Sequence, residues 1–150
     1  MSLNYDFKTH WDTAYIKNSI EDLGWYEDDP LESLDLINKC NLSKKSIIFN
    51  AGAGATKLIQ KLKDYGYSNI YINDISESAI DKLKSSISNI DGLSFVVDDL
   101  TNPKDLLNLE MVDLWHDRAV LHFFVQQSKQ DAYFDLLKRN IFLNDVRSLS

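Results

Sequence analysis

Residues 45–56 read Lys-Ser-Ile-Ile-Phe-Asn-Ala-Gly-Ala-Gly-Ala-Thr, and the predicted fold class follows from this stretch. Its first half is a short apolar, β-branched run, which is typical of a strand buried on both faces. Two of the five glycines in the chain, Gly52 and Gly54, follow at once and predict a tight turn. Residues 56–65 then place leucine and isoleucine at helical spacing, and Gly66 suits a helix C-terminus. The local unit is therefore strand, glycine turn, helix.

The same alternation continues along the chain. The further predicted strands are residues 69–73, 93–97 and 111–115, with a weaker fifth at 141–146, and the helices between them are 76–89, a short stretch after Pro103, and 119–140. Strands that alternate with helices of this length favour a mostly parallel sheet covered on both faces. We therefore predict a doubly wound α/β fold.

The segment before the first strand is predicted to be helical over residues 7–17 and 31–40. Because it is too short for a core of its own, we expect residues 1–43 to form a lid over the open end of the sheet, with residues 44–150 as the α/β core of a single domain. The indoles of Trp11 and Trp25 either belong to this lid or fill the core.

Composition excludes several classes of protein. The 150 residues contain 16 Lys and Arg against 23 Asp and Glu, which gives a formal net charge of −7 and disfavours nucleic acid as a partner. No apolar run approaches the ~20 residues of a membrane span, and residues 1–5 lack a basic-then-apolar leader. The single thiol, Cys40, forms no internal disulfide, so a cytoplasmic protein is expected. The three histidines, His10, His116 and His122, lack metal-ligand spacing, and we predict no metal.

Polar residues follow all four clear strands. They are Asn50 to Thr56 after the first strand, Asn73 and Asp74 after the second, Asp98 and Asp99 after the third, and His116 to Arg118 after the fourth. In an open α/β sheet, ligands bind beyond the carboxyl ends of the strands. The four strand ends are thus expected to form one site.

The glycine turn and Asp74 together predict a nucleoside-containing ligand. Asp74 follows Gly52 by about 20 residues at the end of the next strand, where a carboxylate accepts both hydroxyl hydrogens of a ribose. Asp99, or Asp98 beside it, would accept from an adenine amino group, although an Asp pair is also common in turns and helix N-caps. Lys57 stands where a dinucleotide-binding turn has its third glycine, which disfavours NAD. Asn50 instead offers a neutral acceptor for an ammonium group.

These residues resemble the first motif of the class I S-adenosylmethionine-dependent methyltransferases, acidic-x-Gly-x-Gly-x-Gly/Ser. The chain is most similar to a small-methyltransferase branch with three further motifs. The matching stretches are His-Trp-Asp-x-x-Tyr at residues 10–15, Gly-Trp-Tyr at 24–26, and Trp-His-Asp-Arg-Ala-Val-x-His-Phe at 115–123.

The resemblance implies a Rossmann-like methyltransferase fold, S-adenosylmethionine as cofactor, and a small molecule or a protein side chain as substrate. The cofactor-binding residues that it implies are Trp11, Asn50, Ala51, Gly52, Gly54, Asp74, Ile75, Asp98, Asp99, Leu100 and His116. The glycine turn would lie beside the methionine part, and Asp74 would bind the ribose. Where the acceptor needs deprotonation, His116 is the candidate base, with Asp117 and Arg118 as orienting or anion-binding partners.

The sequence departs from that family in two places. Asn50 replaces the acidic residue at the end of the first strand, and the family's sheet has seven strands, so the last strands are expected to be missing at the C-terminal end. An alternative function is therefore a truncated, non-catalytic binding module, in which a second copy or another chain covers the exposed sheet edge. An NAD-dependent oxidoreductase is the least favoured alternative.

Overall fold

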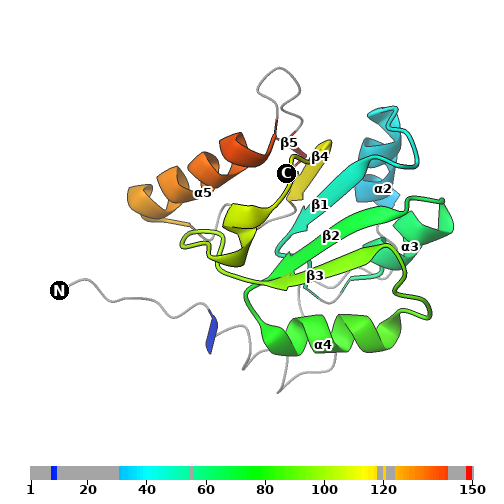
Figure 1. The fold of residues 1–150 in the computed structure, drawn as a ribbon, viewed down its shortest axis with the longest axis horizontal. Helices are drawn as coiled ribbons and strands as arrows, with labels where there is room; N and C mark the ends of the chain where they lie inside the picture. The colour runs from blue at the N-terminus through cyan, green and yellow to red at the C-terminus, as the bar shows by residue number, and fades with distance from the viewer. Residues whose placement is uncertain are drawn as a thin grey trace.

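A computed structural model describes residues 8–9, 31–54, 56–117, 120, 124–141 and 148–149. Within these ranges the elements are α2 (Leu31–Lys39), β1 (Ile47–Ala51), α3 (Leu58–Asp64), β2 (Asn69–Asp74), α4 (Glu77–Ser86), β3 (Leu93–Val97), the 3-10 helix η2 (Asp105–Asn108), β4 (Leu114–Asp117), α5 (Gln127–Asn140) and β5 (Ser148–Leu149). Figure 1 shows the strands side by side, with helices on both sides of the sheet.

The sheet has five strands in the order β3-β2-β1-β4-β5, and every neighbouring pair is parallel. β1 lies at the centre, so its apolar run is buried by neighbours on each side, as expected for a parallel sheet. The chain order reverses between β1 and β4, which is the kind of switch point where open α/β sheets bind ligands. The predicted doubly wound α/β fold is confirmed.

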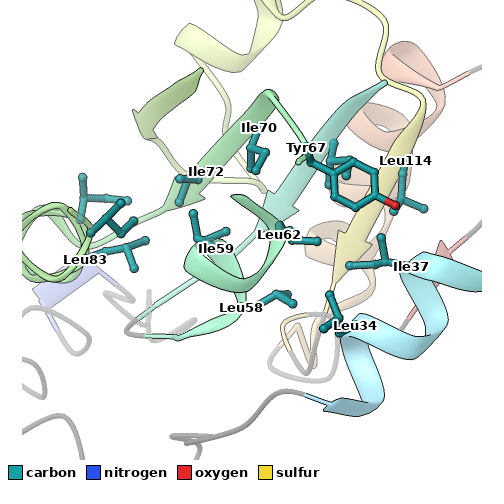
Figure 2. Close-up of a cluster of buried hydrophobic side chains, with 13 residues drawn as sticks. Leu34, Ile37, Leu58, Ile59, Leu62, Tyr67, Ile70, Ile72, Leu83 and Leu114 are labelled. Carbon is teal, nitrogen blue, oxygen red and sulfur yellow. The ribbon is translucent and has the colours of Figure 1, made fainter. Parts of the chain in front are cut away.

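The alternation of side chains along the strands divides the core into two layers. One layer contains side chains from α2, α3 and α4 packed on one face of the strands (Figure 2); its fully buried members include Ile37, Ile59, Leu62 and Ile72. The other layer, on the opposite face, packs η2 and α5 against Phe49 and Trp115. Both faces of the sheet are therefore covered by helices.

Several predicted boundaries were wrong. The fourth strand is Leu114–Asp117 instead of 111–115, because residues 111–113 precede the ladder that β4 forms with β1. The last helix begins at Gln127 instead of residue 119, and the segment after Pro103 is a 3-10 helix over Asp105–Asn108. The fifth strand is Ser148–Leu149, whereas the predicted range 141–146 is largely outside the described residues.

The N-terminal segment is described only in part. The α2 residues Leu34 and Ile37 pack into the same core layer as α3, so this part of the predicted lid segment belongs to the core. The predicted helix over residues 7–17 and both indoles, Trp11 and Trp25, lie outside the described residues except for Lys8 and Thr9. The lid and the domain division stay predictions.

Candidate functional site

The carboxyl ends of β1, β2 and β3 are joined by hydrogen bonds around the glycine turn. The Gly54 amide donates to Asp74 Oδ2 at 2.8 Å, and the Ala53 amide donates to the Asn73 carbonyl oxygen at 2.7 Å. The Asp98 amide donates to the Asp74 carbonyl oxygen at 3.1 Å. The strand ends that the sequence predicted to converge are thus connected within one hydrogen-bonded edge.

Asp74 is the centre of this edge. Its carboxylate is 5% exposed and accepts from two backbone amides, those of Gly54 and, at 2.9 Å, Ser76. Asp74 therefore fixes the conformation of the glycine turn through its carboxylate.

The glycine turn has a backbone that only glycine adopts easily. Gly52 and Gly54 have φ values of 56° and 58°, and a Cβ on Gly52 would overlap the Val120 side chain. Two amides of the turn have partners within the protein, because Gly52 donates to Asn73 Oδ1 at 3.4 Å and Gly54 donates to Asp74. The following helix, α3, begins at Leu58, within the predicted range 56–65, and is seven residues long.

Asn50 lies next to this turn at the end of β1 and is 2% exposed. Neither its amide oxygen nor its amide nitrogen has a hydrogen-bond partner within the described part of the chain. A buried amide normally has partners, because leaving it without any costs about 1–3 kcal/mol. Asn50 is therefore a candidate for contact with a ligand.

His116 pairs in register with Asn50 across β1 and β4. Register partners of a parallel ladder point to the same sheet face, so the imidazole and the Asn50 amide share one face of the sheet. Asp117 follows His116 and therefore points to the opposite face. There its Oδ1 accepts from the Val120 amide at 2.9 Å and its Oδ2 accepts from the Tyr133 hydroxyl. These contacts favour a positioning role for Asp117, and its predicted part in catalysis stays a prediction.

Asp98 and Asp99 have different contacts. Asp98 accepts from three backbone amides, those of Asp99, Lys104 and Leu106, and so orders the turn that leads into η2. Asp99 Oδ1 accepts from the amide and the hydroxyl of Thr101 at 2.8 and 2.7 Å. No hydrogen bond from the rest of the described chain reaches Asp99 Oδ2. Of the two carboxylates, Asp99 thus has more acceptor capacity for a ligand.

The remaining predicted site residues are placed as follows. Ala51 and Leu100 are buried in the core layer around Trp115, and Ile75 is half-buried with its carbonyl oxygen 3.5 Å from Lys8 Nζ. Trp11 and Arg118 lie outside the described residues. Across the described ranges, no group of three or more His, Cys, Asp or Glu side chains is arranged to hold a metal ion, and no helix is long and apolar enough to span a membrane.

Two residues that shape the site are not among the predicted binding residues, although Asn73 was placed among the polar residues at the strand ends. Asn73 is completely buried, and its amide nitrogen donates to the carbonyl oxygens of Val96 and Asp98, so it ties the glycine turn to β3. A polar residue inside a buried strand was the available signal. Tyr133 gave no such signal, because it belongs to α5, far along the chain from the strand ends that it supports.

We expect Tyr133 to make stability fall at alkaline pH. Burial raises the pKa of its phenol above the ordinary value of 10.0, and the nearby Asp117 carboxylate raises it further. Above pH 10 the unfolded chain loses this proton while the folded protein keeps it, so the free energy of unfolding falls with rising pH. The slope from one proton is about 1.4 kcal/mol per pH unit.

The measurement is chemical denaturation of the wild type and Tyr133→Phe between pH 8 and pH 11. The stability difference between the two proteins is expected to be constant below pH 10 and to shrink above it, since all other titrating groups are shared. A difference that stays constant up to pH 11 contradicts the expectation.

Comparisons with known proteins identify the fold. No protein-family model matches the sequence, and no curated protein matches it. The N-methyltransferase NodS from Bradyrhizobium japonicum, solved with S-adenosyl-L-homocysteine, is similar with a TM-score of 0.70 at 17% identity, over 91% of this chain and 68% of NodS. The CcbJ methyltransferase from Streptomyces caelestis is similar with a TM-score of 0.68 at 16% identity, over 93% of this chain and 55% of CcbJ.

An S-adenosylmethionine-dependent methyltransferase from Clostridium acetobutylicum has a TM-score of 0.64 at 15% identity, over 89% of this chain and 52% of that structure. The chain therefore has the Rossmann-like fold of the S-adenosylmethionine-dependent methyltransferases. It spans 52–68% of the length of these three solved structures.

Proposed function

We propose that this chain binds S-adenosylmethionine at the carboxyl ends of β1 to β4 and transfers its methyl group to a small molecule or a protein side chain. The observation that carries the proposal is the buried Asn50 amide, which has no hydrogen-bond partner among the described residues and stands beside the glycine turn. The methyltransferase fold and the converging strand ends support it.

The residues fit the parts of this cofactor. The Asn50 oxygen is an acceptor for the ammonium group, the Asp74 carboxylate at the end of β2 is the acceptor for the ribose hydroxyls, and Asp99 Oδ2 is an acceptor for the adenine amino group. When bound, the cofactor supplies a methyl group on a sulfonium, and the sulfur leaves as a neutral thioether. The protein therefore has to align the acceptor more than it has to provide acid–base catalysis. His116 is the base for an acceptor that must lose a proton.

Isothermal titration with S-adenosylmethionine and S-adenosylhomocysteine tests the cofactor. We expect saturable binding of both compounds with one site per chain. No heat of binding up to millimolar concentration contradicts the proposal, and NADH in the same concentration range serves as the control nucleotide.

A second candidate is a non-catalytic binding module, which is favoured by the two-residue β5 at the edge of the sheet. It predicts cofactor binding with no methyl transfer to any acceptor, together with pairing of two copies through the β5 edge. Light scattering distinguishes the two candidates on the second point, because a stable monomer contradicts edge pairing.

Exchange of Asn50 for leucine is expected to stabilise the protein and to weaken ligand binding. Leucine has a similar size and removes two buried polar groups that lack partners, so the free energy of unfolding should rise by about 1–3 kcal/mol. The affinity for S-adenosylhomocysteine should fall at least about tenfold, because the ammonium group then has no acceptor. Thermal denaturation and calorimetric titration measure the two effects.

The matched control is Asn73→Leu. The Asn73 amide is fully bonded, to Gly52, Val96 and Asp98, so the same substitution should lower the free energy of unfolding by at least about 2 kcal/mol. If both variants lose stability alike, Asn50 is an ordinary core residue and not a ligand-binding one.

A further inference from the structure

A buried chain of hydrogen bonds links α5 to the end of β4. The Trp115 Nε1–H donates to the Tyr133 hydroxyl at 2.9 Å, and that hydroxyl donates to Asp117 Oδ2. All three side chains are at most 3% exposed. A hydroxyl is needed at this position, because one group has to accept from the indole and donate to the carboxylate at once.

The other oxygen of Asp117 continues the link toward the glycine turn. Asp117 Oδ1 accepts from the Val120 amide at 2.9 Å, which fixes the backbone of Val120. The Val120 side chain occupies the space where a Cβ on Gly52 would lie. The turn is therefore held between Val120 on one side and Asn73, which accepts from the Gly52 amide, on the other.

The glycine turn depends on Val120 for part of its restraint. The Gly52 amide reaches Asn73 Oδ1 only at 3.4 Å, near the upper limit for a hydrogen bond, so this bond restrains Gly52 weakly, whereas Ala53 and Gly54 are held by shorter bonds to Asn73 and Asp74. Contact with Val120 is a further restraint on Gly52, and the position of Val120 depends on Asp117. Asp117 in turn is a buried carboxylate, and its Oδ2 is held by Tyr133.

We propose that Tyr133 is a positioning residue for the glycine turn, acting through Asp117 and Val120. The inference rests on the proposed function, in which this turn lies beside the methionine part of the cofactor. The hydroxyl of Tyr133 touches neither cofactor nor substrate in this scheme. Through its hydrogen bond to Asp117, it fixes the position of Val120. The position of Val120 in turn determines how much space remains next to Gly52.

Two ligands that differ only in the methionine part test the proposal. S-Adenosylhomocysteine carries the amino acid, whereas 5′-methylthioadenosine keeps the nucleoside and lacks the amino acid. Tyr133→Phe is expected to weaken S-adenosylhomocysteine about tenfold and to change the affinity for 5′-methylthioadenosine by less than about twofold, as measured by calorimetric titration. Equal effects on both ligands, or no effect on either, overturn the proposal, since a merely structural role does not separate them.

Two further variants keep the test decisive. Tyr67→Phe is the matched control, because Tyr67 is equally buried but belongs to the other core layer, and it should leave the affinities for both ligands unchanged. Val120→Ala acts later in the same chain of contacts and leaves no buried polar group without a partner. It should reproduce the selective loss for S-adenosylhomocysteine even if Tyr133→Phe does not fold, and an unselective result overturns the proposal.

A measurement without ligand separates this proposal from the proposed function. In the free protein, Tyr133→Phe should shift the amide NMR resonances of Gly52 and Val120 and speed up exchange of the Val120 amide hydrogen, while Tyr67→Phe should do neither. Unchanged Gly52 and Val120 signals overturn the positioning role. If the wild type binds neither nucleoside, the proposed function fails, and the amide measurement alone decides the role of Tyr133.

Discussion

Replacement of Gly52 by alanine is expected to abolish binding of S-adenosylhomocysteine and to lower the free energy of unfolding by about 2–5 kcal/mol. The φ of 56° costs a residue with a Cβ about 1–2 kcal/mol, and the overlap with Val120 adds about 1–3 kcal/mol of overpacking. Both effects displace the turn that Asp74 and Asn73 hold in place. Chemical denaturation and calorimetric titration measure the two losses.

Gly66→Ala is the matched control for this variant. Gly66 also has a positive φ, of 97°, but an added Cβ would meet nothing closer than Lys44 Cδ at 3.8 Å. Gly66→Ala should therefore lose stability from backbone strain alone and keep its affinity for the ligand. The double variant Gly52→Ala, Val120→Ala should recover the part of the stability that the overlap removes. Unchanged ligand binding in Gly52→Ala contradicts the placement of the cofactor at this turn.

Removal of the Asp74 carboxylate, by Asp74→Ala, is expected to lower the affinity for S-adenosylhomocysteine about 100-fold or more. Two charge-assisted bonds to the ribose hydroxyls are lost, each worth about 1.5–3 kcal/mol. The amides of Gly54 and Ser76 also lose their acceptor, so the free energy of unfolding should fall by about 2–4 kcal/mol. Titration and denaturation at one temperature give both values.

The two roles of Asp74 can be separated. Wild type should prefer adenosine to 2′-deoxyadenosine, and Asp74→Asn should lose that preference, since an amide offers only one oxygen to the ribose. Asp113→Ala is the control for lost backbone anchoring, because Asp113 Oδ2 accepts from the Ile47 amide at 2.7 Å at the start of β1. It should lower stability and leave both affinities unchanged. A preserved ribose preference in Asp74→Asn rules out Asp74 as the ribose ligand.

Much of the fold could be predicted because its signals are local. The apolar run before Asn50, the glycines after it and the helical spacing beyond them all lie within residues 45–65, and β1, β2 and β3 were found close to their true bounds. The end of the chain was harder. The predicted helix from residue 119 and the strand over 111–115 were wrong, since an apolar segment has no period that separates a strand, a loop and a helix start.

The candidate site, like the fold, could be predicted where its residues follow the strands directly. Asn50, Asp74 and the glycines follow strands directly, and parallel strands end at one edge, so their convergence could be expected from order along the chain. The separate roles of Asp98 and Asp99 could not, because both suit a turn equally well in sequence. Their hydrogen bonds decide between them.

By itself, the sequence determined the strand, turn and helix order and the polar residues at the strand ends, since both depend on neighbours a few positions apart. Only the tertiary structure decided that the Asn50 amide is buried with no partner in the part of the chain that the structure describes, and that Asp117 faces Tyr133 instead of His116. Those two facts depend on which face of the sheet each side chain takes and on what a distant helix places against it. Contacts between residues far apart in the chain produce no periodic pattern in the sequence, so they cannot be predicted from it in this way.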